Sequence, residues 1–141
     1  MAISDELRDR VRTQSGNRCG YCQSLQKYVL GILEIDHIIP KAAGGTDDEE
    51  NLWLACSLCN NYKGTQTYAS DPMSQECVKL FNPRTQQWSQ HFTWSEDGTE
   101  IRGLTDCGRA TVKALQLNNK IAVTVRRQWT SAGWHPPKDE G

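Results

Sequence analysis

Two Cys-x2-Cys pairs constrain the fold of this chain more than any other feature of its sequence. Each pair can direct two thiolates at one ion, and together they supply the four sulfur ligands of a tetrahedral structural zinc site. A closed shell of this kind leaves no open position for catalysis. Disulfides or a redox pair are the alternatives, but they fit poorly with an amino terminus that lacks a secretory signal. The predicted zinc ligands are Cys19, Cys22, Cys56 and Cys59.

Length and composition indicate one polar globular domain. The 141 residues suffice for a single compact domain, and only 37% of them are hydrophobic, so a metal staple would offset a small core. No segment is long and apolar enough to span a bilayer, and we therefore expect no membrane partner and a cytoplasmic location. A net charge of −1 argues against strong nonspecific binding of nucleic acid, so any contact with DNA must be local.

One segment of the chain is basic. Residues 101–130 carry six Lys and Arg against one Asp, a local charge of about +5. A solvated helix face and a phosphate-contacting surface both explain this pattern, and spacing alone does not choose between them. Lys63 has the same ambiguity, because a lysine at the end of a helix also complements the helix dipole. The candidate nucleic-acid contacts are Lys63, Arg109, Lys113, Arg126 and Arg127.

The amino-terminal half shows clear helix and strand signals. We expect a helix that Ser4 caps and Gly16 ends, because acidic residues fill its first turn and apolar residues recur at helical spacing. A β-rich segment over 30–38 and a short strand over 52–55 should follow, and then a helix through Lys63. The 33 residues between the two cysteine pairs are more than a zinc ribbon needs, which indicates that a further element lies between them.

The carboxyl-terminal half begins with an expected linker over 65–75, where polar and turn-forming residues dominate. Beyond it, Asp97-Gly98 predicts a hairpin turn that places Trp94 opposite Ile101. A helix over 105–117 should follow the hairpin. The last apolar run alternates like a strand but also recurs at four-residue spacing, and we favour a helix because Gly and Pro stop signals lie beyond it.

Several short motifs occur in an order that resembles the HNH endonuclease family. They are Ile35-Asp36-His37-Ile38-Ile39-Pro40, Gly44-Gly45, Asn51-Leu52 and the run from Cys56 through Asn60 to Lys63-Gly64, and the resemblance covers residues 19–64, about a third of the chain. It implies an α+β fold with a ββα-metal core, stapled by the zinc site and preceded by a helix. On this basis residues 1–66 form the nuclease module, and residues 67–141 form an extension with a hairpin at about 91–104 and helices at about 105–131.

The resemblance also implies roles for individual residues. In the family the His at the position of His37 is the general base that activates water, and the residue at the position of Asp36 binds a divalent cation. Asn51 matches a residue that pins the loop and the base. Asn60 stands where many members have His, and its amide oxygen together with the Asp36 carboxylate favours Mg²⁺ or Mn²⁺ at the catalytic position. The implied activity is hydrolysis of DNA phosphodiester bonds, with one strand nicked at each active site.

Two reservations follow from the residues themselves. Adjacent side chains on a strand point to opposite faces, so Asp36 and His37 need a local twist or bulge to serve one site directly. The acidic run 47–50 is predicted to be a solvated loop and not a metal site. Beside the endonuclease interpretation, a zinc-stapled nucleic-acid-binding module that has lost cleavage and a protein-interaction domain built on the extension both stay open.

Overall fold

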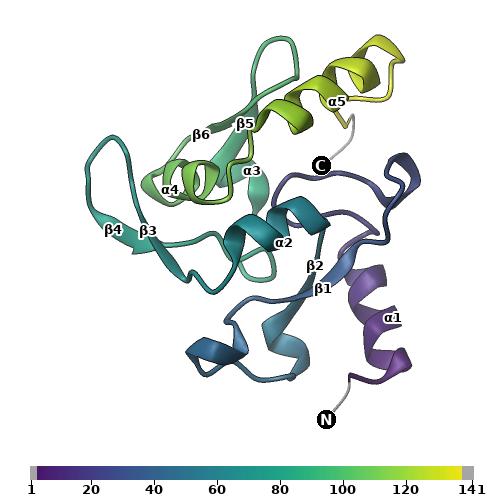
Figure 1. The fold of residues 1–141 in the computed structure, drawn as a ribbon, viewed down its shortest axis with the longest axis vertical. Helices are drawn as coiled ribbons and strands as arrows, with labels where there is room; N and C mark the ends of the chain where they lie inside the picture. Colours follow the sequence, from purple (N-terminus) through teal and green to yellow (C-terminus); the bar gives the residue numbers. More distant parts are fainter. Residues whose placement is uncertain (1–2, 138–141) are drawn as a thin grey trace.

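The computed structural model describes residues 3–137, and its fold is α+β as predicted (Figure 1). Three antiparallel strand pairs, β1–β2, β3–β4 and β5–β6, alternate with helices. Single 3-10 turns occur at 26–28, 41–43 and 49–51. The helices and strands, in chain order, are α1 (Asp5–Gln14), β1 (Glu34–His37), β2 (Leu52–Ala55), α2 (Ser57–Lys63), β3 (Tyr68–Ser70), β4 (Cys77–Lys79), α3 (Trp88–His91), β5 (Phe92–Trp94), β6 (Ile101–Gly103), α4 (Asp106–Ala114) and α5 (Lys120–Ser131).

The first helix forms as its caps predict. The Ser4 hydroxyl accepts a hydrogen bond from the backbone N–H of Leu7 at 3.1 Å, which satisfies one of the free donors of the first turn. The helix ends at Gln14, and Gly16 then takes a positive φ of 67°. Of the apolar stripe, Val11 is fully buried, and α1 packs on β2.

The first strand is shorter than the β-rich segment 30–38 suggests. The side chain of Gln26 holds residues 31–33 in a loop, because its amide nitrogen donates to the Gly31 carbonyl at 2.9 Å and its oxygen accepts from the Leu33 N–H at 2.8 Å. Only Glu34–His37 therefore pairs with Leu52–Ala55, in regular antiparallel register. Strand β2 and helix α2 coincide with their expected positions.

The prediction of a linker over 65–75 is wrong. Tyr68–Ser70 pairs with Cys77–Lys79, and the turn signal at Asp71-Pro72 closes this hairpin. The carboxylate of Asp71 accepts hydrogen bonds from the N–H groups of Met73 and Ser74, and both of its oxygens also bind the guanidinium of Arg109 at 2.9 Å. The turn is thus tied to α4, and the segment belongs to the packed fold.

The second hairpin and the two long carboxyl-terminal helices confirm the other expectations for this half. Trp94 lies opposite Ile101, as the Asp97-Gly98 turn predicts, although the strands end earlier than expected. The Thr105 hydroxyl caps α4 by accepting from the N–H of Gly108 at 3.0 Å. The ambiguous last run is a helix, which the Asn119 side chain caps in the same way.

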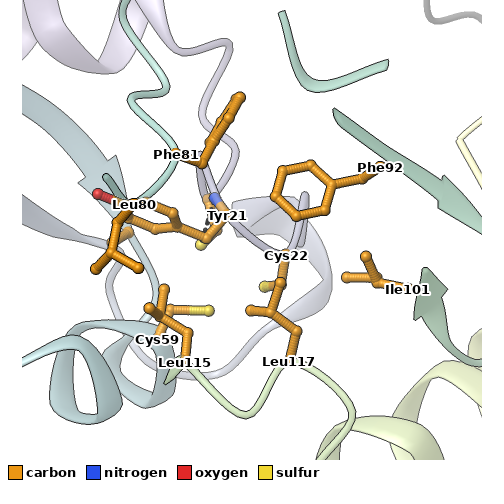
Figure 2. Packing of buried hydrophobic residues seen from close by; sticks show 11 residues of the cluster. Tyr21, Cys22, Cys59, Leu80, Phe81, Phe92, Ile101, Leu115 and Leu117 are labelled. Atoms are coloured by element: carbon orange, nitrogen blue, oxygen red, sulfur yellow. Dashed lines mark hydrogen bonds between the residues drawn. The ribbon is translucent and has the colours of Figure 1, made fainter. Parts of the chain in front are cut away.

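The two halves of the chain share one hydrophobic core. Figure 2 shows zinc-knuckle cysteines packed beside aliphatic and aromatic side chains of the extension. Polar contacts join the halves as well, because the Trp88 indole donates to the Tyr21 carbonyl at 2.8 Å and the Arg84 guanidinium donates to the Leu52 carbonyl. The buried members from both halves are Cys19, Tyr21, Cys22, Ala55, Cys59, Leu80, Phe81, Phe92, Ile101, Leu115 and Leu117.

His135 gives the fold a predicted pH dependence. Its ring is buried against Trp94, at a centroid distance of 4.3 Å, and Nε2 lies 3.0 Å from the Gly98 carbonyl. Burial lowers the pKa of His135 below its ordinary value of about 6.5. On acidification the imidazole of His135 therefore takes up a proton in the unfolded chain before it does so in the folded chain. The free energy of unfolding then falls as the pH drops below about 6.5, by at most about 1.4 kcal/mol per pH unit.

Urea unfolding of the wild type and His135→Gln at a series of pH values between about 7.5 and 5.5 tests this prediction. The wild type should lose stability more steeply than the variant as the pH falls. Parallel pH curves for the two proteins would contradict the assignment.

Candidate active site and metal centre

The four cysteines of the two knuckles meet at one point. Their sulfur atoms all lie within 4.8 Å of one another, and Cys22 Sγ is 3.7 Å from Cys56 Sγ. A zinc tetrahedron with Zn–S bonds of about 2.3 Å has edges of about 3.8 Å, so the cluster fits this ion. Burial raises the pKa of the Cys19 thiol well above its ordinary value, and a bound metal would have to displace that proton.

Backbone and side-chain donors surround the sulfur atoms. The N–H of Tyr21 donates to Cys19 Sγ at 3.4 Å and the N–H of Cys59 donates to Cys56 Sγ at 3.5 Å, which places partial positive charge on two of the ligands. The hydroxyl of Ser24 lies 3.0 Å from Cys22 Sγ. These contacts hold the thiol groups in position, and the set is chemically suited to a structural zinc ion.

Arg126 requires a correction. Its side chain was a candidate nucleic-acid contact, but it is only 2% exposed and lies inside the extension. The guanidinium donates to the carbonyls of Thr99 and Leu117 and stands over the Trp94 ring. It is therefore a buried residue that ties α5 to the chain around it, and it is not placed to contact phosphate.

Oxygen donors gather between β1 and α2. Asp36 is 2% exposed, and its carboxylate accepts from the Tyr21 hydroxyl at 2.7 Å. Glu34, two residues earlier, lies on the same face of the strand and accepts from the Asn60 amide at 2.7 Å. Since the amide nitrogen of Asn60 is used by Glu34, its amide oxygen is the atom left to bind a cation.

Lys63 fills the space beside Asp36. Its ammonium lies 3.3 Å from the Asp36 carboxylate and donates to the His37 carbonyl at 2.8 Å. Burial raises the pKa of the Asp36 carboxyl, and the charge of Lys63 opposes part of that rise. The side chain of Lys63 is 3% exposed. The expectation that Lys63 contacts nucleic acid from the surface is therefore corrected to a buried ion pair.

His37 points away from Asp36. The β1–β2 register is regular, without a bulge, so the two adjacent side chains leave on opposite faces. His37 Nε2 lies 2.7 Å from Asp47 Oδ1, and Lys41 Nζ lies 3.0 Å from the other oxygen of Asp47. The hydrogen bonds from His37 and Lys41 hold the pKa of Asp47 below its ordinary value.

Asn51 ties down both ends of the loop that follows His37. Its amide nitrogen donates to the carbonyls of Ile39 and Thr46, and its oxygen accepts from the Ile39 N–H at 2.8 Å. Gly45 is needed inside this loop, because a Cβ at that position would stand 1.7 Å from the Ile39 carbonyl oxygen. The loop conformation therefore depends on one amide side chain and on one residue without a side chain.

The remaining basic candidates differ in their availability. The Arg109 guanidinium donates to both carboxylate oxygens of Asp71. Its charge is therefore neutralised inside the fold. Lys113 on α4 and Arg127 on α5 are exposed. Only these two of the five candidates present free basic side chains at the surface of the described structure.

Sequence reasoning missed three residues of this region, namely Glu34, Asp47 and Tyr21. The period of two along a strand places Glu34 beside Asp36 and was available as a signal. Asp47 lay inside an acidic run that suggested solvation, and its pairing depends on the loop conformation. Tyr21 lies between two cysteines, and nothing in its spacing pointed to Asp36.

Comparisons with known proteins agree with the motifs. Residues 19–66 match the sequence model of the HNH endonuclease family. The chain is 28% identical over 109 residues to the Septu protein PtuB of Bacillus thuringiensis, which covers 74% of this chain and 38% of PtuB. It is 26% identical over 98 residues to a Vibrio cholerae protein named "Retron Vc95 putative HNH endonuclease", covering 65% of this chain and 44% of that protein.

A third relative is the CRISPR-associated endonuclease Cas9 of Corynebacterium diphtheriae, 35% identical over 89 residues, which covers 57% of this chain and 8% of Cas9. The chain thus spans less than half the length of each of these relatives. No solved structure gives a significant match.

Residues 19–66 therefore match the HNH endonuclease family in sequence, and two of the relatives carry the word endonuclease in their names. The first Cys-x2-Cys pair opens the matched segment, β1 and β2 follow, and the second pair lies at the start of α2. In residues 3–137, no helix combines the length and the apolar character that crossing a bilayer requires.

Proposed function

We propose that the protein is a metal-dependent DNA endonuclease that hydrolyses phosphodiester bonds and nicks one strand at each active site. The observation that carries the proposal is the arrangement on β1, where oxygen donors lie on one face and His37, held by Asp47, lies at the adjacent position on the opposite face. The match of residues 19–66 to the HNH family supports the same chemistry.

His37 acts as the general base. The imidazole of His37, whose Nε2 lies 2.7 Å from the Asp47 carboxylate, takes a proton from the attacking water. The resulting hydroxide attacks phosphorus, and the bond to the leaving 3′ oxygen breaks. Asn51 contributes by fixing the loop that carries the partner of His37.

Asp36 and Asn60 are the residues that would hold the catalytic cation, and the neighbouring Glu34 orients the Asn60 amide. Their oxygen atoms suit Mg²⁺ or Mn²⁺. When bound, the ion neutralises charge on the phosphate and on the leaving oxygen. The Lys63 ammonium lies 3.3 Å from the Asp36 carboxylate, so it would compete with a cation for this ligand.

Exposed Lys113 and Arg127 are the proposed DNA contacts in the extension. We place the protein in the cytoplasm because its proposed zinc site needs four reduced cysteines.

Nicking of supercoiled plasmid by the zinc-loaded protein, with added Mg²⁺ or with EDTA, tests the proposal. We expect conversion to open circles with Mg²⁺ and none with EDTA. The competing function is a binding module without cleavage, which the capture of Asp36 by Lys63 favours. That function predicts a DNA mobility shift with no nicking under any metal.

The metal preference should depend on Asn60. An amide oxygen is a weak neutral ligand, so we expect the wild type to need cation on the order of millimolar. Asn60→His should raise activity with Zn²⁺ or Ni²⁺ relative to Mg²⁺, because imidazole favours borderline metals, and Asn60→Ala should need still more Mg²⁺. Titration of each metal against the nicking rate measures this. Unchanged metal dependence in both variants would show that Asn60 is not a ligand.

A further inference from the structure

We propose that Asp47 is the positioning residue of the general base, selecting the tautomer of His37 in which Nε2 carries the proton. This inference rests on the proposed catalytic role of His37. Asp47 is one of four consecutive acidic residues, 47–50, and it alone of the four is bonded to His37 in the described structure.

The contact has the geometry of a strong hydrogen bond. The distance of 2.7 Å between Nε2 and Oδ1 is typical of a charge-assisted bond, and both side chains are about one quarter exposed, at 26% and 27%. An ionised carboxylate can only accept a hydrogen bond, so Nε2 of His37 must donate. The proton of a neutral ring is then fixed on Nε2, and Nδ1 is left as the basic nitrogen.

The position of Asp47 is itself fixed from two directions. Asn51 binds the carbonyl of Thr46, the residue immediately before Asp47, at 2.8 Å. Lys41 donates to Oδ2 at 3.0 Å and thereby orients the carboxylate plane. The loop thus presents one defined oxygen to the imidazole, which a mobile surface ion pair would not do.

Chemically, the pair assists proton transfer without taking a proton itself. The O–H bond of water breaks, its proton goes to Nδ1, and the hydroxide oxygen forms the new bond to phosphorus. The positive charge that develops on the ring lies beside the Asp47 carboxylate, which stabilises it. The leaving 3′ oxygen departs with the electron pair of the broken bond and takes a proton from solvent.

Lys41 makes a sharp test possible. In Asp47→Asn the ammonium of Lys41 can only donate, so it holds the amide oxygen and turns the amide NH₂ toward His37. The ring must then accept at Nε2 and carry its proton on Nδ1, which is the wrong tautomer for the base. Asp47→Ala removes the acceptor altogether and should give a mixture of both tautomers.

The tautomer is read by long-range ¹H–¹⁵N NMR of the ¹⁵N-labelled zinc-loaded protein at about pH 8.5, where an ordinary imidazole is neutral. We expect Nε2–H in the wild type, Nδ1–H in Asp47→Asn and a mixture in Asp47→Ala. Glu50→Gln, which removes one exposed charge from the same run, is the matched control and should keep the wild-type pattern.

Nicking kinetics supply the second measurement. Asp47→Asn should lower kcat by about 10-fold to 100-fold with KM little changed, as for other residues that orient a reacting group, while Glu50→Gln should keep wild-type kcat. The same His37 tautomer in the wild type and both Asp47 variants would overturn the positioning role, and so would an equal kcat loss in the control. The expected tautomer difference between the wild type and Asp47→Asn, found in a wild type that does not cleave DNA, would instead refute the proposed function. It would leave the role of Asp47 in fixing the His37 tautomer intact.

Discussion

Cys22→Ser is expected to yield unfolded or insoluble protein, and not a folded protein that lacks activity. Cys22 is buried in the core that joins the two halves of the chain, a cluster that also contains Leu117 and Phe92 (Figure 2). Structural zinc contributes an apparent binding free energy of about 10–16 kcal/mol in small zinc domains. Whole domains unfold at a cost of about 5–15 kcal/mol, so loss of the ion removes as much free energy as the fold retains.

The matched control is Cys77→Ser, since Cys77 is an exposed thiol on β4 outside the cluster. Zinc content per chain and far-UV circular dichroism of each purified protein provide the measurement. The wild type and Cys77→Ser should carry one zinc and be folded, and Cys59→Ser should behave like Cys22→Ser. A soluble wild type without zinc, or with an oxidised cysteine pair in its place, would refute the assignment.

Features encoded by local chemistry were predictable from the sequence. The clustering of the four cysteines was predictable because Cys-x2-Cys spacing is itself the geometry of a knuckle. The opposition of Trp94 and Ile101 followed from Asp97-Gly98, because a tight turn sets the register of the strands on both sides. Ser4 likewise marked the start of α1 through a contact only three residues long.

Features that depend on tertiary contacts were not predictable in this way. The three-residue strands β3 and β4 are too short for a periodic signal, and the hairpin is held instead by Arg109, which lies 38 residues beyond Asp71. Charge patterning marked Arg126 as a surface residue, but the packing of α5 against the β5–β6 turn buries it.

The candidate site shows the same division. The Asp36-His37 pair was visible as a motif, whereas the partners of both residues are set by the fold. Asp36 on β1 accepts hydrogen bonds from Tyr21 in the first cysteine pair and from Lys63 on α2, so its partners come from distant parts of the chain. The choice of Asp47 from four neighbouring acids depends on a loop that Asn51 closes. Motifs therefore indicated the candidate residues, and long-range contacts determine how each is held.

His37→Ala should abolish most of the nicking activity while leaving the fold and the zinc content intact. The backbone of His37 keeps its pairing with Leu52, and its side chain, about one quarter exposed at 26%, is not part of the hydrophobic core. Removal of a general base typically lowers the rate by about 10² to 10⁴, so plasmid nicking at saturating Mg²⁺ should fall by that factor. Zinc analysis and thermal unfolding of the same sample establish that the variant is folded. Mn²⁺ binding should be preserved, since of the proposed cation ligands Asp36 lies on the opposite face of β1 and Asn60 lies on α2. A correctly folded His37→Ala protein that nicks at the wild-type rate would eliminate His37 as the base, because removal of the residue that activates water must lower the nicking rate.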